Sequence, residues 1–223
     1  MPASNRPAVK TPSPEMSRFL SSMVMDWEKW HDGIGYDLEA LDALDAHETA
    51  EVVQLLIGRI DGAKGDWYDL EALYRIGTPE ARAALIAALR NSNATIRLHA
   101  AEYLAEEDDA DSGLSKEQKE AVAQDIAGLL KRPNAETGID LLTRLAEQFD
   151  SPVVREALLW CAMDGREDLR VHAAALALYL AGGAPEAFDW EQRPLFLEFG
   201  EADRKVRETA MAELLRRMEA AKK

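Results

Sequence analysis

The sequence predicts an all-α fold, an α-solenoid of about five stacked helix pairs, and three observations lead to this fold class. The hexamer Tyr36–Leu41 recurs unchanged as Tyr68–Leu73, 32 residues further along the chain. One supersecondary unit of that length cannot bury its own apolar face and has to stack on a copy of itself. Hydrophobic residues make up 47% of the chain, enough for a continuous core. Alanine and leucine dominate them and β-branched residues are sparse, which favours helix over strand.

The N-terminal part predicts a tail followed by one helix. Residues 1–15 hold four prolines with small polar residues between them, so we expect a disordered leader. A first helix is expected over residues 16–32, because apolar side chains recur there at spacings of three and four. These side chains are Phe19, Leu20, Met23, Val24 and Trp27.

Repeats are expected to follow over residues 36–218. Each copy of the hexamer opens a helix. After the second copy, Gly77 ends one helix, Thr78 caps the next and Pro79 occupies its first turn. Each unit therefore reads as helix, short turn, helix. Together with the first helix, the repeats predict a single solenoid domain over residues 16–223.

A second internal repeat supports this organisation. Ile96–Ala101 recurs as Leu169–Ala174, and weaker copies start at Val154 and Val206, each after a polar or proline-containing turn. This pattern of turn, apolar residue, arginine and alanine resembles the HEAT-like repeats, including the short bacterial kind also found in phycobilisome lyases. The resemblance implies a right-handed α-solenoid of about five HEAT-like helix pairs. It also implies a protein-binding role, because such solenoids mostly bind other proteins.

Two stretches interrupt the repeats. Residues 106–115 form an acidic insertion, followed by a helix that is expected to start at Ser115. Residues 181–194 form an irregular stretch that begins with two glycines and contains Trp190. Repeat arrays place such insertions on one face, which is often the binding face.

Charge and composition narrow the classes of partner. The formal net charge of -15 would repel a phosphate backbone, so no nucleic-acid partner is expected. No apolar run has the length of a membrane span, and no signal peptide is evident, so we expect a cytoplasmic protein without a membrane partner. The single cysteine, Cys161, lies in an apolar helical stretch and is expected to be a buried, inert thiol.

The candidate partner-binding residues are aromatic and acidic side chains near helix ends. Stacking would place the two Tyr–Asp pairs in one row, and aromatic anchors rimmed by carboxylates suit an arginine or lysine of a partner. The predicted residues are Trp30, Asp32, Tyr36, Asp37, Trp67, Tyr68 and Asp69, with Glu106, Glu107, Asp108, Asp109 and Asp111 of the acidic insertion. The alternative is that each aspartate caps its helix while each tyrosine packs against the next repeat.

No residue pattern predicts catalysis, cofactor binding or a metal site. His99 and His172 occupy equivalent repeat positions, two residues after the repeat arginine, and a structural role is expected for both. Histidine and cysteine spacings typical of metal ligands, and glycine-rich phosphate loops in the right context, are absent from the sequence.

The sequence therefore predicts a non-catalytic protein-binding scaffold, whose partner is one protein with a basic surface. Its most specific form is an acidic bacterial immunity protein, or antitoxin, that occludes a basic cognate toxin with electrostatically steered association. Two alternatives remain open. One is a HEAT-type lyase or another cofactor-handling enzyme, and the other is an adaptor or chaperone for a secreted effector.

Overall fold

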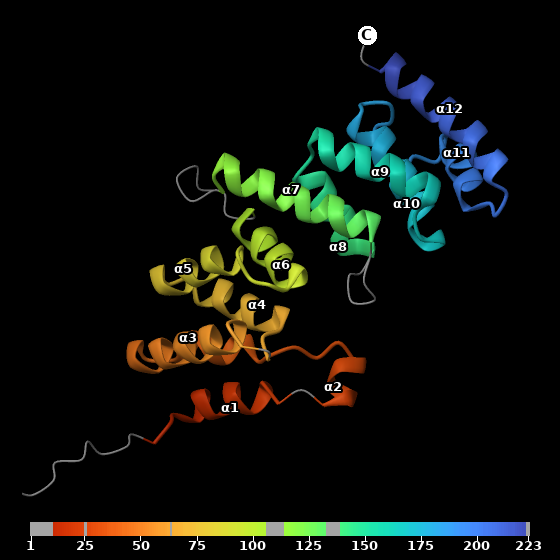
Figure 1. Ribbon diagram of the computed structural model, residues 1–223. Coiled ribbons are helices and arrows are strands. Elements are labelled where there is room, and N and C mark those ends of the chain that lie inside the picture. The colour runs from red at the N-terminus through yellow and green to blue at the C-terminus, as the bar shows by residue number, and fades with distance from the viewer. Residues whose placement is uncertain (1–10, 25, 63, 106–113, 133–138, 222–223) are drawn as a thin grey trace, which may run out of the picture. The chain divides into compact units, whose positions relative to one another are not determined.

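The computed structural model describes residues 11–24, 26–62, 64–105, 114–132 and 139–221. Helices, turns and bends account for the regular structure of these residues, and no strand occurs among them, so the predicted all-α class is confirmed. Contacts divide the chain into two compact units, Met1–Ser92 and Asn93–Lys223. Figure 1 locates the elements of each unit along the chain.

Unit 1 is a set of short helices that pack against elements one or two places away in the chain. Helix α1 packs against the 3-10 helix η1, and α4 packs against η1, α3 and α5. Figure 1 shows α3 lying beside α4. The elements are α1 (Pro14–Ser22), α2 (Trp27–His31), η1 (Leu38–Ala43), α3 (Ala46–Ile60), α4 (Trp67–Ile76) and α5 (Pro79–Ala88).

The helix predicted over residues 16–32 is interrupted, and α1 and α2 replace it. Ser13 caps α1 by accepting a hydrogen bond from the N–H of Met16, so the helix includes Pro14 and the residue after it, which the sequence had placed in the leader. At the other end, the Ser22 hydroxyl donates to the carbonyl of Phe19 and accepts from the N–H of Asp37. Serine bonds of this kind compete with the helical ladder, and the chain leaves the helix there.

The two copies of the hexamer both enter helices, as predicted, but the helices differ. In the first copy Asp37 caps η1, and Asp45 starts α3 by accepting from two backbone N–H groups. In the second copy Asp66 caps α4, which continues to Gly77 in the left-handed conformation at φ 64°. The early cap at Asp45 leaves the first copy room for a short 3-10 helix only.

Unit 2 is likewise built from contacts between elements that lie one to four places apart in the chain. Helix α9 packs against α7 and α10, and α10 also packs against α8, η2 and α12. The elements are α6 (Ala94–Ala105), α7 (Lys116–Lys131), α8 (Ile139–Gln148), α9 (Pro152–Asp164), α10 (Glu167–Leu180), α11 (Arg193–Leu197), η2 (Glu198–Gly200) and α12 (Arg204–Ala220). Ser115 caps α7 in a capping box, as the predicted helix start requires.

Small side chains let α9 and α10 pack closely. The alanines of α10 that are no more than 3% exposed are Ala173, Ala174, Ala175 and Ala177. Cys161 of α9 is fully buried, as predicted, and burial is the main reason that its thiol pKa is raised to about 11. A thiol with that pKa is a packing residue rather than a nucleophile at neutral pH.

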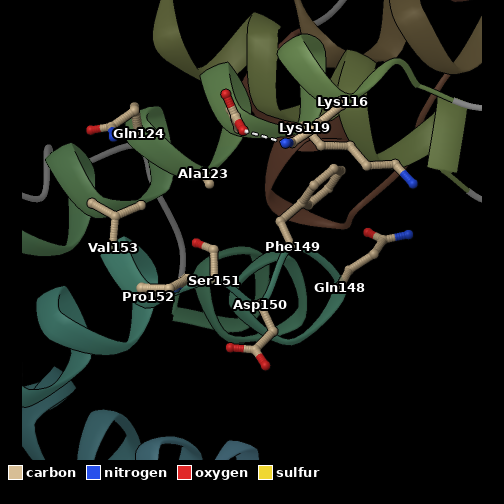
Figure 2. Close-up of a pocket in the computed structure, with 11 residues that line it drawn as sticks. Lys116, Lys119, Ala123, Gln124, Gln148, Phe149, Asp150, Ser151, Pro152 and Val153 are labelled. Atoms are coloured by element: carbon tan, nitrogen blue, oxygen red, sulfur yellow. Dashed lines mark ion pairs between the residues drawn. The ribbon is translucent and has the colours of Figure 1, made fainter.

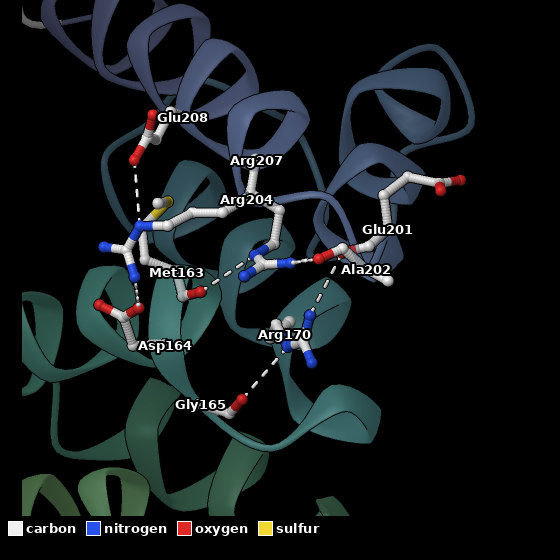
Figure 3. A network of polar contacts seen from close by, with 9 residues as sticks. All are labelled: Met163, Asp164, Gly165, Arg170, Glu201, Ala202, Arg204, Arg207 and Glu208. Atoms are coloured by element: carbon white, nitrogen blue, oxygen red, sulfur yellow. Dashed lines mark hydrogen bonds and ion pairs between the residues drawn. The ribbon is translucent and has the colours of Figure 1, made fainter.

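The repeat arginines fix the turns between helices, as Figure 3 shows for the last repeat. Arg207, which is 9% exposed, donates to the carbonyls of Met163, Glu201 and Ala202 over 2.6 to 3.1 Å. Arg170 donates to the carbonyl of Glu201 at 3.4 Å. Carbonyls near helix ends lack partners within the helix, so these guanidinium groups satisfy acceptors that would otherwise be left unpaired. The arginine of the repeat signature is therefore a structural residue.

Candidate protein-binding site

The predicted row of Tyr–Asp pairs lies inside unit 1. Tyr36 and Tyr68 are 8% and 6% exposed, and Asp69 is fully buried. The Asp69 carboxylate accepts hydrogen bonds from the Tyr36 hydroxyl at 2.9 Å, from Arg59 Nε at 2.8 Å and from the N–H of Asp66 at 2.9 Å. These three predicted binding residues are closed to a partner in this structure, because the neighbouring elements cover them.

The aromatic rings around this network are packed against one another. Tyr36 meets Phe19 edge-on, with ring centroids 5.9 Å apart, and Tyr68 at 5.5 Å. Trp67 is half-buried and lies against Tyr68, with ring centroids 3.8 Å apart. Burial, followed by the charge of Asp69, raises the pKa of Tyr36 well above its usual value, so its hydroxyl stays protonated and donates. Tyr36, Tyr68 and Asp69 therefore belong to the core of unit 1. This arrangement agrees with the alternative hypothesis, in which the repeated tyrosines pack against neighbouring elements.

The other predicted residues lie in several different places. Asp37 caps η1 and pairs with Arg18 at 2.7 Å. Asp32 is exposed, with its carboxylate 3.2 Å from His31, and Trp30 lies within α2. The predicted residues of the acidic insertion, Glu106, Glu107, Asp108, Asp109 and Asp111, lie outside the described residues.

A cavity of about 420 Å³ in unit 2 brings together the exposed aromatic residues of the irregular stretch. Three large apolar side chains at this cavity are unusually exposed: Trp190 at 72%, Leu197 at 52% and Phe188 at 47%. The lining residues are Val171, His172, Phe188, Trp190, Arg193, Phe196 and Leu197, and we call this set the aromatic pocket. Apolar side chains gathered around one concavity mark a binding surface more strongly than the same residues scattered singly.

Glycines and a tight turn position the pocket. Gly182, at φ 77°, ends α10 in the left-handed conformation, and the next N–H, of Gly183, donates back to the carbonyl of Leu178. Further on, the Asp189 side chain accepts from the N–H of Glu191, and this turn presents the intervening tryptophan to solvent. The chain therefore leaves α10 sharply and shows its aromatic residues at the surface.

Helix α11 forms the rigid wall of the pocket. Phe196 and Phe199 are 3% and 0% exposed, and they anchor α11 and η2 in the core of unit 2. The Arg217 guanidinium of α12 donates to the Gln192 side chain at the start of α11. Leu197 and Trp190 are thus exposed on a framework that is itself fixed.

The ring geometry within the pocket is defined by two contacts. His172 of α10 meets Phe188 nearly edge-on, with ring centroids 5.0 Å apart and planes at 73°. The Arg193 guanidinium carbon lies 4.5 Å from the centroid of the Trp190 ring, within the range of a cation–π contact. The pocket therefore already holds one cation on an exposed aromatic face.

The segment of the chain that carries the aromatic pocket is rich in acidic residues. Residues 181–203 carry six carboxylates and one basic side chain, Arg193. Glu186, Glu191 and Glu198 are exposed and make no ion pair within the described part of the chain. Exposed aromatic side chains and exposed carboxylates therefore occur together in this irregular stretch.

Sequence reasoning singled out this stretch but not its residues. The sequence marks the irregular segment over 181–194 and its Trp190, whereas its pattern predicts no site role for Phe188, Arg193 or Leu197. His172 was assigned to structure, yet it lines the pocket. The available signal was the density of aromatic residues over 188–199, a few residues after Gly182 and Gly183.

A second concavity of unit 2, about 470 Å³, lies between α7 and the turn that leads into α9, and Figure 2 shows it from close by. Lys116 and Lys119 of α7 lie near the Phe149 ring at this cleft. Lys116 pairs with Glu120 at 3.8 Å, and the Ser151 hydroxyl accepts from a backbone N–H as the cap of α9. These polar groups are occupied in local structure, and their arrangement matches no acid–base or nucleophilic set.

Neither a metal site nor a membrane-spanning helix has a candidate in the part of the chain that the structure describes. Among the described residues, no group of three or more histidine, cysteine, aspartate or glutamate side chains is placed to hold a metal ion. In the same ranges no helix combines the length and the apolarity that crossing a bilayer requires. Comparisons with protein-family models, curated proteins and solved structures found no significant match to this chain.

Proposed function

We propose that this chain is a protein-binding scaffold built as a right-handed α-solenoid of HEAT-like helix pairs. The packing of helices against elements close to them in the chain supports this architecture, as does the recurring arginine that fixes a turn. Solenoids of this kind offer extended surfaces on which inserted segments carry the specificity.

The aromatic pocket is the proposed contact surface. The observation that carries the proposal is that Trp190, Phe188 and Leu197 are all exposed around one cavity, on a wall fixed by the buried Phe196. Exposing three large apolar side chains in one place costs hydration free energy, and burial against a partner recovers it. Binding hot spots are rich in tryptophan and are centred on residues of this kind.

The proposed partner is a protein with a basic surface. The chain carries a net charge of -15, and the exposed glutamates of the pocket segment make no ion pair among the described residues. Complementary charge speeds association and selects among partners, whereas the apolar anchors supply most of the affinity. Binding should therefore weaken with salt without disappearing.

The most specific form of the proposal is an immunity protein that occludes a basic toxin. The acidic balance of the chain supports it, because toxins that act on nucleic acids or nucleotides often have basic clefts. Its test is genetic. If an intact toxin gene lies beside the gene for this protein, deletion of this gene alone should stop growth, and normal growth would contradict the immunity role.

The binding role itself is tested by affinity purification of the full chain from cells that make it, at about 0.1 M and about 0.5 M salt. The expected result is one basic protein, captured in a stable ratio at the lower salt and in a smaller but measurable amount at the higher salt. An acidic captured protein, or capture unaffected by salt, would contradict the electrostatic part of the proposal. No captured protein would contradict the binding role.

A further inference from the structure

The lining of the aromatic pocket differs in charge from the rest of the chain. Arg193 and His172 are its ionisable residues, and no carboxylate lines it. Both are bases, although the chain as a whole carries a net charge of -15. The glutamates of the same segment lie outside this lining, so the surface has a cationic centre within an acidic stretch of sequence.

Arg193 is also unusual among the arginines of this protein. Most guanidinium groups in the described ranges contact a carboxylate or a carbonyl; Arg97, for example, makes a two-point pair with Asp125 at 2.6 and 2.7 Å. The Arg193 guanidinium makes no ion pair or hydrogen bond within those ranges, although carboxylates are frequent nearby in sequence. Its one contact of note is the face of Trp190.

The Arg193 guanidinium has hydrogen-bond donors that no described residue uses. Its carbon lies 4.5 Å from the centroid of the Trp190 ring, and its N–H groups make no hydrogen bond within the described ranges. The planar group therefore keeps an edge of N–H donors available. That edge matches the two oxygens of a carboxylate. Beside it, Phe196 and Leu197 supply an apolar wall, in a cavity of about 420 Å³. This volume lies in the range that small ligand groups occupy, roughly 300 to 1,000 Å³.

Resting on the proposed function, we infer that the aromatic pocket binds the C-terminal residue of the partner, an apolar residue with a free carboxylate. A C-terminal residue carries an apolar side chain and a carboxylate on the same Cα. The side chain would fill the cavity while the carboxylate accepts hydrogen bonds from Arg193. Basic residues that precede the C-terminal residue of the partner would face Glu186, Glu191 and Glu198. One peptide end would thus pair its carboxylate with Arg193 and its basic side chains with these glutamates.

The test uses two fluorescein-labelled octapeptides of alternating glycine and lysine that end in phenylalanine, one a free acid and one an amide. Fluorescence polarisation with the full chain should show the acid binding about tenfold more tightly, as expected for one charge-assisted pair. Arg193→Gln should remove this difference, and Trp190→Ala should weaken both peptides. Arg90→Gln is the matched control, since Arg90 is an exposed arginine of unit 1, and it should leave the difference intact.

Equal binding of acid and amide would overturn the inference, and so would a preference for the acid that persists in Arg193→Gln. Absence of binding by both peptides would also overturn it. If both bind equally and Trp190→Ala abolishes their binding, the pocket remains a peptide site and the proposed function stands. The proposed function is tested separately, by the affinity purification described above, and it is contradicted if the full chain captures no protein there.

Discussion

The two copies of the hexamer, Tyr36–Leu41 and Tyr68–Leu73, share every residue and fold differently. The first forms a 3-10 helix, and the second forms the start of an α-helix. Asp37 of the first copy is partly exposed and pairs with a surface arginine, whereas Asp69 of the second is fully buried and accepts three hydrogen bonds. Identical local sequence thus takes its role from what packs around it.

The copies also contact each other directly. The tyrosine of the first, Tyr36, donates to the aspartate of the second, Asp69, and Arg59 bonds to both. A repeat whose copies complete each other's hydrogen bonds stabilises the fold, so its recurrence needs no ligand to explain it. The stretch of the aromatic pocket over residues 181–197 lies outside both sequence repeats, and its Phe188, Trp190 and Leu197 side chains are exposed. The unrepeated segment is therefore the better candidate for binding.

The largest expected effect follows removal of the buried carboxylate. Asp69→Ala leaves Arg59 without its ion-pair partner and should lower the free energy of unfolding by about 3 kcal/mol. Urea unfolding measures the loss, and hydrogen exchange in peptides from α3 and α4 assigns it to unit 1. A loss no greater than that of Asp37→Ala would show that the two copies are energetically equivalent.

The next effect concerns the bond that joins the copies. Tyr36→Phe removes one donor to Asp69 and should lower the free energy of unfolding by roughly 1 to 2 kcal/mol at neutral pH. Ring packing is preserved in this variant, so the measured loss reports the hydroxyl alone. An unchanged melting temperature would mean that the contact between copies contributes nothing.

The same hydroxyl predicts a dependence on alkaline pH. The folded-state pKa of Tyr36 is raised above its usual value of about 10, first by burial and then by Asp69. The folded state thus favours the protonated form. This stabilisation is fully present below about pH 10 and is lost as the pH rises further. Wild-type unit 1 should lose stability above that pH more steeply than Tyr36→Phe, and parallel profiles for the two proteins would exclude this cause.

The smallest effect on stability is expected for Asp37, in the first copy of the hexamer. Asp37→Ala removes the cap of η1 and an exposed pair with Arg18, and should cost about 1 kcal/mol or less. Differential scanning calorimetry at low and high salt separates the two contributions, because only the ion pair is screened. A loss of several kcal/mol would place Asp37 in a buried network, as Asp69 is.

Local signals in the sequence predicted helix ends well. Thr78 and Ser115 cap the helices that were expected to start there, because a cap is a contact within one turn. The break between α1 and α2 was not predicted, since it depends on a hydroxyl of Ser22 that bonds a residue of a later segment. Contacts over such separations are not visible in local periodicity.

Burial of the candidate site was equally hard to predict. The Tyr–Asp pattern gives no sign that Arg59 and Phe19 cover it, because both come from other elements. The sequence did predict that residues 181–194 interrupt the repeats. Gly182, at a positive φ, explains why the chain leaves α10 there. Which side chains face solvent depends on Phe196 being fixed in the core, and that is a property of packing.

The central claim is that the aromatic pocket binds the partner while the repeated hexamer holds the fold. Three baits test it directly: the wild-type chain, Trp190→Ala and Asp37→Ala, each checked for folding and used for quantitative capture from the same cells. Trp190 is 72% exposed, so its removal should leave stability nearly unchanged. The account predicts that wild type and Asp37→Ala capture the same basic protein equally and that Trp190→Ala captures at most about a tenth as much, a loss of about 1.4 kcal/mol in binding. Equal capture by Trp190→Ala, or loss of capture by a folded Asp37→Ala, would contradict it.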